Sequence, residues 1–171
     1  MQEGVLSLRL VPETWIIAPI VTKEQLNRYI AKGWLTDDDA AHLDRAFPRN
    51  SRGEPIIFRM WLRSPLNQVV NKHNFDRNLL DFRILDDKGI EVNYVVINDQ
   101  PLRYRRNIEV KGKKTTEYFE YIDGTYELNF KVKVNNPKEF VEAFALAGRV
   151  GLLSRTKHGY GKFNIEILES L

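Results

Sequence analysis

The chain has 171 residues, of which 43% are hydrophobic and 29% are charged, and its formal net charge at pH 7 is +3. This length suffices for one hydrophobic core, so we expect a single domain over residues 1–171. The absence of cysteine excludes disulfides and thiolate metal ligands, and no apolar run is long enough to span a bilayer. No signal-peptide pattern opens the sequence, which predicts an intracellular, cytoplasmic protein whose mild basic excess permits an anionic partner.

The first third of the chain predicts two strands separated by two short helices. Residues 5–11 alternate between apolar and polar side chains, as in a strand with one buried face. A capping-box pattern at residues 22–25 begins a helix, and the acidic stretch 36–39 begins a second one that ends at Pro48. Residues 56–63 alternate again and predict the second strand.

Two β-hairpins are predicted next, over residues 81–97 and 102–122. In the second hairpin, Gly112 is expected at the first central position of a type II′ turn, because glycine takes a positive φ at little cost. The register then places Tyr104 opposite Tyr121.

The last part of the chain predicts a strand, a helix and a final strand. Residues 126–134 alternate without interruption, Asn136 and Pro137 begin a helix that ends at Gly148, and residues 162–168 form the last strand. Without the hairpins the order is βαββαβ. We therefore predict the α+β class, as one ferredoxin-like domain with an antiparallel sheet and a pair of β-hairpins inserted at about residues 64–124.

On the predicted sheet face without helices, basic side chains surround one aromatic side chain. Cations bind phosphates and a flat ring stacks on an unpaired base, so this pattern favours single-stranded nucleic acid. A solvated face around a half-buried tryptophan is the alternative interpretation. The side chains are Arg9, Arg59, Trp61, Arg63, Lys131, Lys133 and Lys162.

Cations also gather on the second hairpin. A protruding basic hairpin can clamp a phosphate backbone or contact a neighbouring subunit, whereas lysines that protect an exposed sheet edge from aggregation are the alternative. The candidates for contact with a nucleic-acid backbone on this hairpin are Arg103, Arg105, Lys111 and Lys113.

Catalytic patterns are sparse. The three histidines, His42, His73 and His158, are scattered and show no metal-ligand spacing, so we predict neither a metal site nor a cofactor. The aspartates at positions 37–39 are interpreted as residues that stabilise a helix N-terminus. No nucleophile elbow, P-loop or dinucleotide-binding pattern is present.

The stretch GRVGLLSRTKHGYGKF, residues 148–163, combines four glycines with four basic side chains. Free backbone amides beside cations form a nest that suits phosphates, and a purely structural turn between helix and strand is the alternative. The candidates for contact with an anion are Arg149, Gly151, Arg155, Lys157, His158, Gly159, Gly161 and Lys162.

The apolar helix, this glycine-rich loop and the final strand, together residues 125–168, resemble the C-terminal part of the RAMP superfamily of CRISPR-associated proteins. The resemblance implies a ferredoxin-like, RNA-recognition-motif-type domain whose loop glycines, Arg155, Lys157 and Lys162 contact RNA. It also implies single-stranded guide RNA and other CRISPR-complex subunits as partners. Leu152 and Leu153 replace the small or polar residues of many members, so the first half of the loop is expected to pack inward.

Three functions are compatible with these patterns. The leading hypothesis is an RNA-binding subunit of a CRISPR-type ribonucleoprotein in antiviral defence, without catalytic residues. The enzyme alternative is a metal-independent, repeat-processing endoribonuclease with His42 as general base and Tyr29 as its partner. The third possibility is a protein-interaction module that retains the fold without RNA binding.

Overall fold

The computed structural model describes residues 3–170, and its largest sheet has five strands in the order β10-β1-β9-β4-β5. Every pairing in this sheet is antiparallel. The sheet and its helices run in the order βαββαβ, with α2 after β1 and α3 after β9, and the α+β class is confirmed. The first helix and the second strand of this order are α2 and β4, however, and not the predicted segments 22–48 and 56–63. The bounds are β1 (Gly4–Pro12), α2 (Arg59–His73), β4 (Arg83–Leu85), β5 (Glu91–Val92), β9 (Leu128–Val134), α3 (Pro137–Val150) and β10 (Phe163–Ser170).

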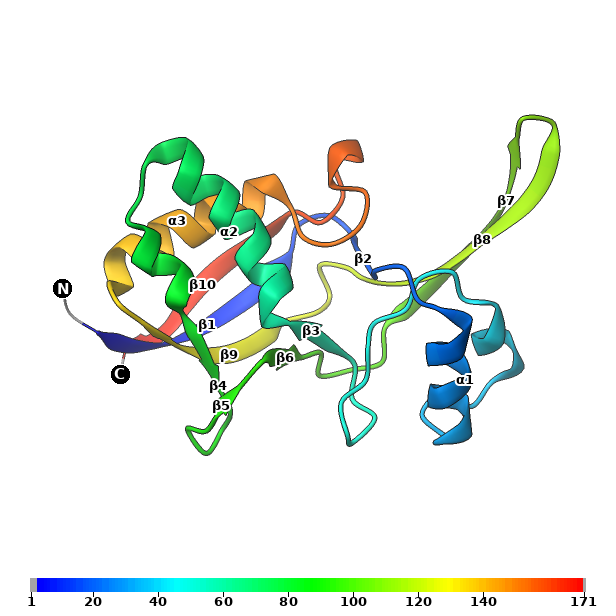
Figure 1. Cartoon of the computed structure of the whole chain (residues 1–171), viewed down its shortest axis with the longest axis horizontal. Helices are drawn as coiled ribbons and strands as arrows, with labels where there is room; N and C mark the ends of the chain where they lie inside the picture. Colours follow the sequence, from blue (N-terminus) through cyan, green and yellow to red (C-terminus); the bar gives the residue numbers. More distant parts are fainter. Residues whose placement is uncertain (1–2, 171) are drawn as a thin grey trace.

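Helices α2 and α3 cover one face of this sheet, and the main core lies between the two layers (Figure 1). Leu8 in the middle of β1 is fully buried there, together with Phe140 and Phe144 of α3. Helix α3 begins where predicted, because the Asn136 side chain accepts a hydrogen bond from the Glu139 amide. Among the described residues, no helix has the length and apolarity needed to cross a membrane.

The predicted strand over residues 56–63 is wrong beyond Phe58. Strand β3 (Ile56–Phe58) is short, and α2 begins at the next residue. The apolar residues continue at helical spacing and are buried, but Pro65 lies inside the helix and normally argues against one. Arg59, Trp61 and Arg63 therefore lie on α2 and not on the helix-free face of the sheet.

Residue 64, the predicted start of the insertion, consequently lies within α2, which belongs to the main helix layer. Two other segments lie outside the βαββαβ framework: one connects β1 to β3, and one connects β4 to β9. Their elements are β2 (Ile16–Ile17), α1 (Lys23–Ala31), a 3₁₀ turn (Asp38–His42), β5, β6 (Tyr94–Val96), β7 (Leu102–Val110) and β8 (Lys113–Ile122). The helix predicted to follow Thr36 is only that 3₁₀ turn, capped by Asp37.

The two outer segments pair with each other and with β3. Strands β2, β8 and β7 form a three-stranded sheet, and β3 pairs with β6. A second, smaller core forms under α1, where Leu26, Tyr29 and Leu35 pack with Tyr118 of β8. A buried ion pair connects the chain before β3 to β8: the Arg49 guanidinium donates to both carboxylate oxygens of Glu120, at 2.9 and 2.8 Å.

The β7-β8 hairpin projects away from the rest of the molecule (Figure 1). Its strands match the prediction, but its turn does not, since Lys111 and Gly112 both have positive φ, 52° and 79°, as in a type I′ turn. Tyr104 lies opposite Phe119, so the predicted pairing with Tyr121 is also wrong.

Candidate functional site

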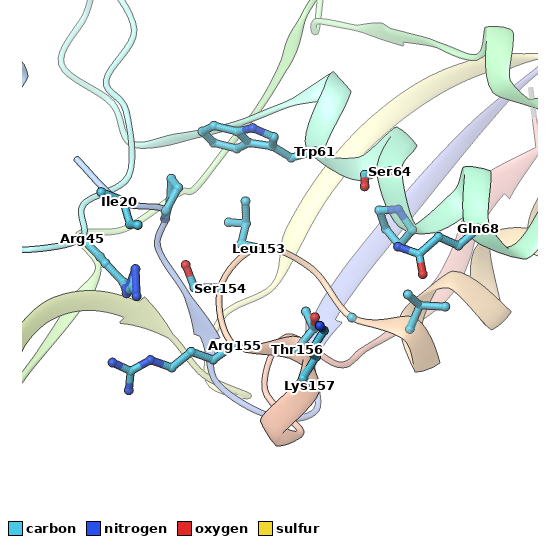
Figure 2. A pocket seen from close by; sticks show the side chains of 14 residues that line it. Ile20, Arg45, Trp61, Ser64, Gln68, Leu153, Ser154, Arg155, Thr156 and Lys157 are labelled. Carbon is cyan, nitrogen blue, oxygen red and sulfur yellow. The ribbon is translucent and has the colours of Figure 1, made fainter. Parts of the chain in front are cut away.

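An open groove of about 770 Å³ lies between α2 and the glycine-rich loop. Three segments that are far apart in sequence form it: Pro19, Ile20 and Arg45 on one side, the first turns of α2 on another, and residues 150–157 on the third (Figure 2). No acidic side chain of the described residues lines this groove. Its chemistry is thus cationic and partly aromatic.

Trp61 supplies the aromatic surface. Residues 61, 64 and 68 recur at helical spacing, so α2 presents the indole, the Ser64 hydroxyl and the Gln68 amide along one stripe of the groove. The edge of the Trp61 ring packs against Phe58 with centroids 4.9 Å apart, which fixes the orientation of the ring. The aromatic side chain that the sequence assigned to the sheet face therefore lies beside the glycine-rich loop.

Arg45 is held at the rim by its backbone. Its carbonyl accepts the Glu120 amide at 3.0 Å, and an isolated antiparallel bridge joins Arg45 to Ile20. Within residues 3–170 the guanidinium forms no ion pair. Two effects lower the pKa of Arg45 from its ordinary value: partial burial, which is the larger, and the positive charge of Arg155. An anion placed between these two guanidinium groups would relieve both costs.

The glycine-rich loop folds back onto the core. Leu152 is fully buried, as predicted for the first half of the loop, and its amide binds the Gly161 carbonyl at 2.9 Å. A Cβ on Gly148 would lie 2.1 Å from the Phe163 carbonyl oxygen, so this glycine permits α3 to contact β10. Gly159 has a φ of 89° and nothing within 4 Å of an added Cβ. A Cβ on Gly161 would likewise meet the backbone of Leu152. Among Gly148, Gly159 and Gly161, only Gly159 leaves open space for a ligand.

Arg155 lies in the loop and reaches across to β8. Its guanidinium forms an ion pair with Glu117 and lies 5.5 Å from the Phe119 ring centroid. Arg155 and Arg106 both hold the pKa of the Glu117 carboxyl below its ordinary value, the hydrogen bond from Arg155 having the largest effect. This ion pair fixes one wall of the groove.

Acidification should therefore release that wall. The Glu117 carboxyl has a lower pKa in the folded protein than in the unfolded chain, where it is near 4.3. Its ionised form therefore stabilises the folded protein above pH 4.3, and this stabilisation is lost as the pH falls through the folded-state pKa. We expect the wild-type protein to lose more stability than Glu117→Gln between about pH 5 and pH 3. Thermal unfolding of both proteins across this range measures it, and parallel curves would contradict the assignment.

The predicted sheet-face cations lie apart from the groove and have acidic neighbours. Arg9 lies 3.5 Å from both Glu127 and Glu166, and Lys133 lies 3.4 Å from Glu3. Lys131 is half-buried on the same side of β9. Arg9 and Lys133 are thus paired with carboxylates, and Trp61 is not part of this face.

The hairpin cations divide into two sets. Near the base, Arg103 binds Asp37 and Arg105 lies 4.0 Å from Asp39, so these aspartates attach the 3₁₀ turn to β7. At the tip, the lysines are exposed and form no ion pair within the described residues; they are Lys111, Lys113 and Lys114.

Several other candidates have structural contacts. Arg59 donates to the carbonyls of Phe82 and Leu80 at 2.7 and 2.8 Å, which ties α2 to the chain before β4. Arg149 pairs with Glu13 and also donates to the Phe163 carbonyl. The remaining candidates, Arg63, His158 and Lys162, lie outside the groove, as do Gly159 and Gly161, whereas Gly151 and Lys157 line it.

The two residues of the enzyme alternative have different surroundings. Tyr29 is buried in the small core, where its ring lies 6.0 Å from Trp34. His42 is exposed and lines a second hollow, together with Arg45 and Arg155. Sequence reasoning missed Ile20, Arg45, Ser64 and Gln68, because no motif marks them and only the fold brings them together.

No family model and no curated protein matches the sequence. Among solved structures, the fold is similar to that of a chain in "Cryo-EM structure of the Type III-B Cmr-beta bound to cognate target RNA". The TM-score is 0.64 and the sequence identity is 10%, over 99% of this chain and 61% of that chain. This protein therefore shares its fold with a subunit of an RNA-bound complex and spans about three fifths of that subunit's length.

Proposed function

We propose that the chain is an RNA-binding subunit of a CRISPR-type ribonucleoprotein and holds single-stranded guide RNA in the groove between α2 and the glycine-rich loop. One observation carries the proposal: Trp61, Arg45 and Lys157 come from distant segments and line one open groove, and none of the described residues that line it is acidic. A ring for a base and cations for phosphates are the elements of single-strand recognition. The similarity of fold to a chain of an RNA-bound complex supports it.

The hairpin tip fits a supporting role in the same assembly. The turn between β7 and β8 lies at the far end of the hairpin from α2 (Figure 1), and its three exposed lysines are available to a phosphate backbone or to an acidic surface of another subunit. The partners proposed for this chain are accordingly guide RNA and other CRISPR-complex subunits.

Substitution of the groove residues should weaken RNA binding in distinct ways. Loss of the stacking ring in Trp61→Ala should reduce affinity for a single-stranded RNA roughly 5- to 150-fold, the equivalent of about 1–3 kcal/mol per stacked base. Arg45→Ala and Lys157→Ala should each reduce the slope of log K against log salt by about 0.7. Fluorescence-anisotropy titrations at several salt concentrations measure both effects.

Arg9→Ala is the matched control, because it removes one cation from the helix-free sheet face. It should leave the salt slope unchanged. If Arg9→Ala weakens binding and Trp61→Ala does not, RNA lies on the sheet face and not in the groove. If the wild-type protein binds no RNA, the protein-interaction module is correct, and EDTA-resistant cleavage lost in His42→Ala would indicate the endoribonuclease.

A further inference from the structure

Ile20 is an exposed apolar side chain between two hollows. With 76% of its surface exposed, it is the most exposed of the large hydrophobic residues in the described chain. On one side lies the groove of Trp61, and on the other lies a hollow of about 540 Å³ lined by Leu26, Leu43 and Phe119. Both hollows are within the range of volumes that small ligands occupy in proteins.

The backbone holds Ile20 in place. The amide of Val21 donates to the Asp44 carbonyl at 3.2 Å, and the amide of Ala46 donates to the Pro19 carbonyl at 3.1 Å. These bonds surround the bridge between Ile20 and Arg45 on both sides. Because the backbone is fixed in this way, only the side-chain torsions of Ile20 lose freedom when a ligand covers it.

Two guanidinium groups lie where the two hollows meet. Arg45 and Arg155 line the groove and the second hollow alike, as Ile20 does. Among the described residues that line the two hollows, the acidic ones lie in the second hollow, where Glu117 is paired with Arg155 and Asp44 accepts the Tyr118 amide at 3.1 Å. The shared position between the hollows therefore suits one phosphate, with an apolar space on either side of it.

We propose that Ile20 is a wedge that separates two successive bases of the bound single strand, with one base on Trp61, the next in the second hollow, and their common phosphate at Arg45 and Arg155. The inference rests on the proposed function and adds the conformation that the RNA adopts. Aliphatic side chains that enter between bases unstack them, because the side chain replaces the neighbouring base as the contact surface.

An oligoadenylate with a single 2-aminopurine tests the wedge, since this base is quenched by stacked adenines and becomes bright when it is unstacked. The 2-aminopurine is placed at each position of the probe in turn. With saturating wild-type protein we expect the 2-aminopurine fluorescence to rise several-fold at one of these positions. Ile20→Ala should abolish most of this rise while affinity falls less than roughly tenfold, because only part of one aliphatic side chain is lost. Ile20→Ala should melt near the wild-type temperature, since the substituted side chain is exposed.

Met60→Ala is the matched control, because Met60 is 75% exposed and lines neither hollow. It should retain the full fluorescence rise. If Ile20→Ala binds RNA and gives the wild-type rise, the wedge is wrong and the proposed function stands. If the wild-type protein does not bind the probe, both fail. If Ile20→Ala leaves RNA binding and the rise intact but releases another subunit of the complex, this surface contacts protein and the wedge is likewise overturned.

Discussion

Glu120→Ala should lower the free energy of unfolding by about 3–5 kcal/mol, because it leaves the Arg49 guanidinium buried without a counter-charge. The side chains of Arg49 and Glu120 are 0% and 1% exposed. The substitution also removes the acceptor of the Phe47 amide, which binds Glu120 at 2.9 Å. Urea unfolding monitored by tryptophan fluorescence measures the loss.

A surface pair of the same kind provides the control. Glu127→Ala removes a carboxylate that is 57% exposed and lies 3.5 Å from Arg9, and it should cost less than about 1 kcal/mol. The double substitution Arg49→Met with Glu120→Leu should recover part of the loss by replacing the ion pair with apolar contacts. Equal effects of Glu120→Ala and Glu127→Ala would show that burial of the Arg49–Glu120 pair contributes nothing.

Gly161→Ala should destabilise the protein by at least about 3 kcal/mol, since strained φ and steric overlap act together. Gly161 has a φ of 84°, and a Cβ would lie 2.3 Å from the Leu152 carbonyl oxygen. The neighbouring atoms are backbone, so relief requires movement of the loop and not of a side chain. Differential scanning calorimetry should record a large fall in melting temperature.

Gly159→Ala is the informative comparison, because its φ is 89° but its Cβ would meet open space. It should cost only about 1–2 kcal/mol, the penalty of a left-handed conformation for a residue with a side chain. A similar loss in Gly159→Ala and Gly161→Ala would contradict the packing argument. RNA titrations of folded Gly159→Ala then test whether a ligand approaches this position, as the glycine-rich pattern predicts.

The sheet could be predicted where side chains alternate without interruption, as in β9, because every second residue of that strand is buried. Helix α2 could not be predicted, because its first residues continue the alternating pattern of β3 and because Pro65 normally argues against a helix. The helix continues through Pro65 and is stabilised by burial of Leu62, Leu66 and Val69. Tertiary packing thus outweighed the local preference of proline. This error moved Trp61 to the wrong surface.

The candidate site was partly predictable for the same physical reason. Glycines and cations that are contiguous in the chain, as at residues 148–163, mark a loop before its position is known. Arg45 and Ile20 carry no such signal, because their roles arise only when the chain before β3 pairs with the chain after β2. Residues that form a site through long-range pairing are not visible in local patterns.

Strand β2 lies between the hairpin and the glycine-rich loop and is hydrogen-bonded to both. Ile17 pairs with Tyr121 of β8, and its carbonyl accepts the Ser154 amide of the loop at 3.3 Å. Opening of the loop therefore breaks a hydrogen bond to a strand that also pairs with the base of the hairpin, and we expect opening of the loop and of the hairpin base to be coupled. With such coupling, binding of any partner to the hairpin would favour binding at the loop, and binding at the loop would favour binding at the hairpin by the same factor.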